Sequence, residues 1–465
     1  MFRVGIKKLA IGVILGLATI TWFAGCATAM APSKRVAMRA PDGMTADEAF
    51  VLARQYVNQE SADQFEQVAA RAAQHPLGIY VDYWRLKLRL IDRRIDTAPA
   101  PDADVQRFLN EQGSSLVADL LRRDWMLSLG RRGEWTTLLV QYPAWILKDD
   151  PQVHCYQLLA RTQRGESVLP SARQLLAQTR ELGDGCGALL EGLSRNGSFK
   201  RDDLRRRLMG ALEANSAPSI RQIALLMNLD GERLDIALNR PAKILAALDG
   251  KELDLIALIR LARQDPKAAA EKIASLKLAA PDKSFAWSQI AAASMRRLDP
   301  EALGWVREGL AAEASDDTWS WLARAALRGQ DWKTLSAAIN RMSPEGQRDP
   351  AWIYWQARSL QAAGKRDEAE AMWRAIAGQY HFYGQLAAEE FGQLTLAPPR
   401  PTAPSEDELV EPERNAGFAR ALKFYELGLR PEGNREWNFQ LRGLNDRQLL
   451  PPPIGPAAAR CSTAA

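Results

Sequence analysis

The chain has 465 residues, of which 47% are hydrophobic and 25% are charged, and this is the composition of a folded protein rather than a disordered one. The formal net charge is only +5, and basic runs such as residues 205–207 alternate with acidic residues. This pattern predicts solvated helix faces and no nucleic-acid partner. The chain is too long for one compact core, but a repeat structure grows without that limit.

The N-terminus has the features of an export signal. A short basic segment precedes an apolar core over residues 9–23, which is too short for a comfortable membrane span. The core ends in Phe23-Ala24-Gly25-Cys26, which resembles the lipobox of bacterial lipoproteins. We predict a signal peptide over residues 1–26 with Cys26 as the lipidation site. The alternative is cleavage near residues 27–29 without acylation.

Both alternatives predict that the mature chain is exported to the periplasm of a Gram-negative bacterium. If Cys26 carries a lipid, we expect the protein to be anchored at the outer membrane.

Residues 351–392 show the repeating unit of the chain. Apolar positions at helical spacing are interrupted at Gly364 and then resume, which predicts a helical hairpin. A bulky aromatic residue returns every 34 residues, at Trp287, Trp321 and Trp355. That period is typical of an α-solenoid, in which we expect these rings to pack between neighbouring hairpins.

The sequence therefore predicts an all-α fold, a right-handed α-superhelix (solenoid) of helical hairpins with the shape of a ring or horseshoe. Beyond the signal peptide, we expect a flexible linker over residues 27–44 and the superhelical domain over residues 45–378. A helical linker domain follows over residues 379–450 and contains a Pro-rich segment at residues 397–404. We expect residues 451–465 to form an aberrant disordered tail.

Two cysteines remain after the export signal and the tail are set aside. Cys155 and Cys186 are about one hairpin apart in a chain that we expect in an oxidising compartment, so they predict a disulfide. The alternative is a pair of unpaired core cysteines. His154 is the only histidine nearby, and metal-ligand spacings are absent from the sequence, so we expect no metal and no other cofactor.

Several segments resemble the soluble lytic murein transglycosylases of Gram-negative bacteria. They are residues 75–86, 122–135, 382–390 and 421–441. The resemblance extends over residues 45–450, which match the non-catalytic superhelical and linker domains of that family. It implies an exported enzyme whose superhelix curls into a ring. It further implies a lysozyme-like domain on that ring, which cleaves the MurNAc–GlcNAc bond of peptidoglycan glycan strands without hydrolysis and leaves 1,6-anhydro ends.

The resemblance places that catalytic domain after Leu450, where only a short tail with three successive prolines follows. The family signature is a Glu-Ser pair followed by Gly-Leu-Met-Gln, and Gly-Leu-Met-Gln is absent from the sequence. The pairs Glu60-Ser61 and Glu166-Ser167 fall at solenoid positions, so we assign neither of them a catalytic role. We predict a chain that is truncated, through a frameshift or a pseudogene, and inactive alone. We expect its last helix pair to fray.

Two alternatives come from other classes of protein. The chain could be a stand-alone periplasmic scaffold of helical repeats that binds peptidoglycan or protein partners without catalysis. It could also be a lipoprotein repeat module for outer-membrane assembly. The family-specific segments favour the transglycosylase interpretation over the second alternative.

Overall fold

The structure is a computed structural model, and it describes residues 43–91, 100–179, 181–245, 252–393, 402, 405, 414–445 and 447–449. Within these ranges all regular elements are helical. The predicted signal peptide with Cys26, the tail and most of the Pro-rich segment lie outside the described residues.

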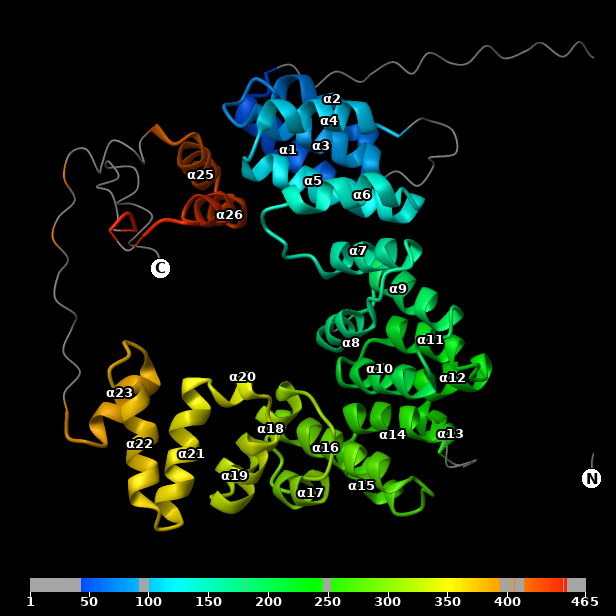
Figure 1. Cartoon of the computed structure of the whole chain (residues 1–465), viewed down its shortest axis with the longest axis vertical. Coiled ribbons are helices and arrows are strands. Elements are labelled where there is room, and N and C mark those ends of the chain that lie inside the picture. The colour runs from blue at the N-terminus through cyan, green and yellow to red at the C-terminus, as the bar shows by residue number, and fades with distance from the viewer. Residues whose placement is uncertain are drawn as a thin grey trace, which may run out of the picture.

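The first half of the superhelix forms the blue, cyan and green part of Figure 1. Its helices are α1 (Ala46–Asn58), α2 (Ala62–Ala72), α3 (Gly78–Ile91), α4 (Asp102–Gln112), α5 (Leu116–Arg132), α6 (Trp135–Gln141), α7 (Pro151–Gln163), α8 (Leu169–Gln178), α9 (Asp184–Arg195), α10 (Arg201–Glu213), α11 (Ala217–Leu226), α12 (Gly231–Asn239) and α13 (Pro241–Ile244).

The second half continues through yellow to red. Its helices are α14 (Glu252–Gln264), α15 (Pro266–Ile273), α16 (Ala280–Arg296), α17 (Ala302–Gly309), α18 (Asp316–Arg328), α19 (Trp332–Asn340), α20 (Pro344–Gln347), α21 (Pro350–Ala362), α22 (Arg366–Ile376), α23 (Phe382–Glu389), α25 (Ala416–Glu426) and α26 (Arg430–Gln440).

The ends of these helices follow from local sequence. Thr45 opens α1 with a capping box, in which its hydroxyl accepts from the Glu48 N–H while the Glu48 carboxylate accepts from the Thr45 N–H. Gly133 ends α5 in the left-handed region with a φ of 75°, which glycine adopts without strain. Gly364 has a φ of 80° between α21 and α22, at the turn that the sequence predicts.

The tryptophans of the 34-residue period occupy α16, α18 and α21, one on each helix. Trp287, Trp321 and Trp355 are all partly buried against the continuous core of the superhelix. The prediction that these rings pack against the core is confirmed.

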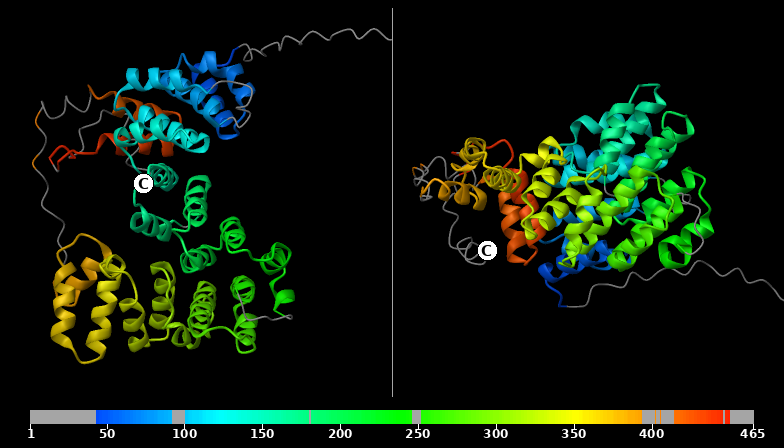
Figure 2. Two further views of the ribbon diagram at one scale, coloured as in Figure 1. Left: turned by 45° about the vertical axis from the view of Figure 1, so that its right-hand side comes forward. Right: turned by 90° about the horizontal axis from the view of Figure 1, so that it is seen from below.

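The helices stack on one another along a curve that leads from α1 to α23 (Figures 1 and 2). Helices α25 and α26 then return to the start of the chain and lie against α1 and α3. We call this pair the closing hairpin. The structure thus has the ring-like superhelix that the sequence predicts.

Contacts of the closing hairpin with the N-terminal helices are both apolar and charged. Phe424 is fully buried, and its ring lies 6.1 Å from the Phe50 ring and 4.9 Å from the Tyr80 ring. The Glu436 carboxylate is also fully buried and accepts a hydrogen bond of 2.7 Å from the Tyr80 hydroxyl. The expectation that the last helix pair frays is wrong, because it assumed that these helices have no packing partner.

Helix α23 packs with α21 and α22 in a second, smaller core that includes Tyr354, Trp373 and Ala387. The predicted domain boundary between residues 378 and 379 falls inside this cluster, so packing does not mark a division there. None of the described helices is both long enough and apolar enough to cross a lipid bilayer.

Candidate functional site: a pocket between helix ends

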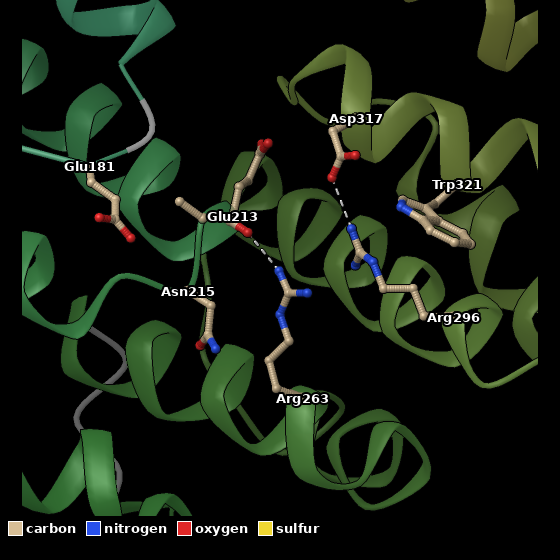
Figure 3. A pocket seen from close by; sticks show the side chains of 8 residues that line it. Glu181, Glu213, Asn215, Arg263, Arg296, Asp317 and Trp321 are labelled. Carbon is tan, nitrogen blue, oxygen red and sulfur yellow. Dashed lines mark hydrogen bonds and ion pairs between the residues drawn. The ribbon is translucent and has the colours of Figure 1, made fainter. Parts of the chain in front are cut away.

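A pocket of about 430 Å³ lies where the C-terminal ends of α10, α14 and α16 meet the start of α18 (Figure 3). We call it the helix-end pocket. Its volume falls in the range of small-molecule sites, roughly 300–1,000 Å³. Its lining residues are far apart in the sequence, and they are Glu181, Glu213, Ala214, Asn215, Arg263, Arg296, Asp317 and Trp321.

The turn after α10 forms one wall. Asn215 has a φ of 56°, in the left-handed region that asparagine tolerates better than most residues. Ser216 then begins α11 by accepting a hydrogen bond from the Ser219 N–H. The Asn215 side-chain oxygen accepts from the Arg260 guanidinium, which holds the amide at the edge of the pocket.

Glu213, the last residue of α10, joins two hairpins that are distant in the sequence. Its two carboxylate oxygens accept hydrogen bonds of 3.1 and 3.2 Å from the Ser315 N–H, and one of them accepts from the Thr318 hydroxyl at 3.3 Å. Burial raises the pKa of the Glu213 carboxyl, although these hydrogen bonds lower it. The hydrogen bonds of the Glu213 carboxylate are therefore used at the N-terminus of α18, where they join α10 to α18.

Arg263, near the end of α14, reaches back to the preceding hairpin. Its Nη2 donates a hydrogen bond of 2.7 Å to the backbone carbonyl of Glu213, where the helix dipole favours a cation. Its Nε is buried and has no hydrogen-bond partner within the described residues. Burial lowers the pKa of Arg263 to about 10, so the guanidinium is still charged at neutral pH.

The positive charge of Arg296, at the end of α16, is balanced by a carboxylate rather than by a helix end. Its Nη2 pairs with Asp317 at 3.0 Å, and its guanidinium lies 5.0 Å from the centre of the Trp321 ring. The Arg324 guanidinium lies 5.3 Å from the same ring. Trp321 is thus engaged by two cations, and such cation–π contacts fix the ring and the guanidinium of Arg296 against each other.

A second, larger pocket of about 870 Å³ adjoins the first, because both are lined by the exposed residue Glu181. Its other walls are the end of α5, Tyr156 on α7, the start of α9, and residues 216–222. The Glu181 carboxylate therefore stands between the two pockets, and it has no hydrogen-bond or ion-pair partner in the part of the chain that the structure describes.

This arrangement favours binding over proton transfer. A general acid must present its carboxyl oxygen to the reacting group. In the helix-end pocket the Glu213 oxygens face Ser315 and Thr318, and Asp317 is paired with Arg296. The charged groups left to meet a ligand are Arg263 and Glu181.

The structure places the two predicted cysteines side by side. Cys155 on α7 and Cys186 on α9 have sulfur atoms 2.02 Å apart and Cα atoms 4.8 Å apart, in the range of a disulfide. This bond closes a loop between two neighbouring hairpins. No group of three or more His, Cys, Asp or Glu side chains that could hold a metal is found among the described residues.

The two Glu-Ser pairs lie in exposed turns. Glu60 connects α1 to α2 with a φ of 54°, and Ser61 stands at the N-terminus of α2. Glu166 follows α7 and pairs with Arg161 at 2.6 Å. Neither pair lies in an enclosed cavity, so the structure gives neither glutamate the shielded surroundings of a catalytic carboxyl.

Sequence reasoning missed the helix-end pocket, although Trp321 was singled out as a repeat position. One signal for this pocket was present in the sequence, because arginines recur at the ends of the helices. Arg263 and Arg297 are one 34-residue period apart, and each donates to backbone carbonyls at the end of an earlier helix. A cation that recurs at helix ends predicts capping, but it does not show which helix ends meet.

Comparison with known proteins finds similar sequences among the soluble lytic murein transglycosylases. No protein-family model matches the chain. The chain is 24% identical over 349 residues to the soluble lytic murein transglycosylase of Escherichia coli (strain K12), and this match covers 71% of the chain and 53% of the relative. The corresponding protein of Salmonella typhimurium is 23% identical over the same length. The chain thus spans about half the length of the curated relatives that it matches.

The fold agrees with that match. The crystal structure of an inactive mutant of lytic transglycosylase Slt from Pseudomonas aeruginosa aligns with a TM-score of 0.50 and 23% sequence identity. The alignment covers 89% of this chain and 68% of that one. In its sequence and its superhelical fold, the chain is similar to the soluble lytic murein transglycosylases.

Proposed function

We propose that the described helices form the non-catalytic superhelical part of a soluble lytic murein transglycosylase and bind peptidoglycan during cell-wall turnover. The observation that carries this proposal is the sequence match to transglycosylases whose name specifies murein, together with the shared fold. The reaction implied by the resemblance is the non-hydrolytic cleavage of the MurNAc–GlcNAc bond to 1,6-anhydro products. We assign no step of that reaction to the described residues.

The described residues support a binding role in two ways. The helix-end pocket and its neighbour offer adjoining cavities lined by charged and polar side chains. The helices that line the cavities share one continuous hydrophobic core, and the closing hairpin packs against α1 and α3 at the N-terminal end of the superhelix. The cavities are therefore held on a preorganised frame.

Sedimentation with purified peptidoglycan sacculi tests the proposal. The purified chain should be recovered in the pellet with sacculi and remain in the supernatant with cellulose, an insoluble glycan without peptides. Equal recovery with both materials, or none with either, would overturn the proposal.

The proposed site of action is the periplasm, with attachment to the outer membrane through a lipid on Cys26. Cell fractionation of the wild type and a Cys26→Ser variant tests this part. The wild type should be found with the outer membrane and the variant in the soluble periplasmic fraction. Identical distributions would exclude the lipid anchor.

A further inference from the structure

We infer that the helix-end pocket binds a zwitterionic amino-acid group, with the ligand carboxylate at Arg263 and the ligand ammonium at Glu181. This inference rests on the proposed function, and it names the part of peptidoglycan that the superhelix recognises. The second centre of a diaminopimelate residue in a peptide stem carries such an ammonium and carboxylate on one carbon.

Within the described residues, one cation and one anion of the pocket, Arg263 and Glu181, take part in no ion pair. Arg296 and Asp317 form an ion pair of 3.0 Å and compensate each other. Within the described residues, no carboxylate lies at ion-pair distance from the guanidinium of Arg263. The Glu181 carboxylate is likewise unpaired there. A ligand that carries one charge of each sign therefore completes the charge balance.

Glu213 does not satisfy Arg263, although the two residues touch. The contact uses the backbone carbonyl of Glu213, whereas its carboxylate faces Ser315 and Thr318 on α18. Burial also raises the pKa of Glu213, which favours its neutral form and weakens its influence on Arg263. The desolvated guanidinium is thus left with a helix end as its partner, and a ligand carboxylate would add a charge-assisted hydrogen bond.

The geometry separates the two unpaired charges. Figure 3 shows Glu181 and Arg263 on different walls of the pocket, with Asn215 between them. Asn215 adds an amide that can donate to the ligand. The pocket volume of about 430 Å³ accommodates the end of a peptide side chain in that space.

Other ligand classes fit less well. A neutral sugar usually stacks on an open aromatic face, but Trp321 is already engaged by Arg296 and Arg324. A phosphate with two negative charges would meet the unpaired carboxylate of Glu181 as well as Arg263. A zwitterion is the ligand class that presents a charge of opposite sign to both Arg263 and Glu181.

Calorimetric titration of the full chain with a disaccharide tripeptide that ends in meso-diaminopimelate tests the inference. Arg263→Gln should weaken binding at least about tenfold, a loss of about 1.4 kcal/mol. Glu181→Gln should weaken it in the same direction. The matched controls are Arg328→Gln and Glu345→Gln, which remove the same charges at exposed positions outside the pocket and should leave the dissociation constant unchanged.

Modified ligands assign each charge without altering the protein. Amidation of the carboxyl on the second centre of diaminopimelate should weaken binding to the wild type and abolish the effect of Arg263→Gln. Acetylation of the terminal amine should do the same for Glu181→Gln. If the wild type binds the native, amidated and acetylated ligands equally well, the inference is wrong whatever the variants do, including a variant that does not fold.

The inference and the proposed function can fail separately. If the chain sediments with sacculi but neither amidation nor Arg263→Gln changes its binding to the tripeptide, the pocket assignment fails and the proposed function stands. If the chain does not sediment with sacculi, the proposed function fails. A tripeptide that does not bind the wild type at concentrations of about 1 mM contradicts the inference directly.

Discussion

Removal of the Glu436 carboxylate should open the closing hairpin. This carboxylate has no exposed surface, and it accepts hydrogen bonds of 2.7 Å from the Tyr80 hydroxyl and 2.7 Å from Nε of Arg420. The Arg420 side chain is itself only 16% exposed. Glu436→Ala therefore leaves a largely buried guanidinium without its counter-charge and a buried hydroxyl without its acceptor.

Loss of one partner of a buried ion pair costs about 3–5 kcal/mol. That cost falls on a small unit, because the closing hairpin consists of α25 and α26 and is anchored to the N-terminal helices mainly through Phe424, Glu436 and Glu432. The hairpin should detach before the superhelix unfolds, since each hairpin of a solenoid depends chiefly on its neighbours.

Hydrogen exchange of the backbone amides measures this local opening. A loss of about 3 kcal/mol should accelerate exchange on the order of 100-fold in residues 416–440. Amides of α16 and α18, on the far side of the curve, should be unchanged. The matched control is Glu426→Ala, which removes a carboxylate of the same hairpin that is 53% exposed and paired with Lys423. Such exposed pairs contribute about 0–1 kcal/mol.

The reasoning would be refuted if Glu436→Ala and Glu426→Ala gave the same exchange rates. It would also be refuted if exchange increased uniformly over the chain, since the closing hairpin would then be part of a single cooperative unit.

Two further predictions concern stability. The Cys155–Cys186 pair should be inaccessible to alkylation without a reductant, and alkylation of both cysteines in the unreduced protein would contradict this. A Cys155→Ser, Cys186→Ser double variant should lose about 3–4 kcal/mol of unfolding free energy in chemical denaturation, because the bond closes a loop of 31 residues. Burial lowers the pKa of His75 below its ordinary value of 6.5, although Asp47 raises it, so the unfolded chain binds more protons than the folded one. The contribution of His75 to stability is therefore complete above pH 6.5 and is lost as the pH falls below that value. His75→Gln should reduce the drop in Tm between about pH 7.5 and 5.5. An undiminished drop in the variant would assign the effect to other groups.

Much of the fold could be predicted because the signals are local. The period of Trp287, Trp321 and Trp355 and the turn at Gly364 depend only on hairpin length and helical spacing. Each hairpin buries its apolar face against the next, so the repeat predicts the core as well as the helices.

The candidate site could not be predicted because it depends on how small rotations add up along the superhelix. Glu213 reaches Ser315 across 102 positions, and no spacing in the sequence indicates that these helix ends meet. The same reason explains the error about the last helix pair. Its partners, Arg54 and Tyr80, are 378 and 356 positions away from Glu432 and Glu436.

The most direct test of the account is to incubate the purified chain with peptidoglycan sacculi and to analyse both the pellet and the soluble products. We predict that the protein is found in the pellet and that the supernatant contains no 1,6-anhydro-muropeptides. Anhydro products released by this chain alone would contradict it, because a carboxyl group of the chain would then act as a general acid, a role that we assign to none of the described residues. Protein that stays in the supernatant would contradict it as well, because the superhelix would not bind peptidoglycan.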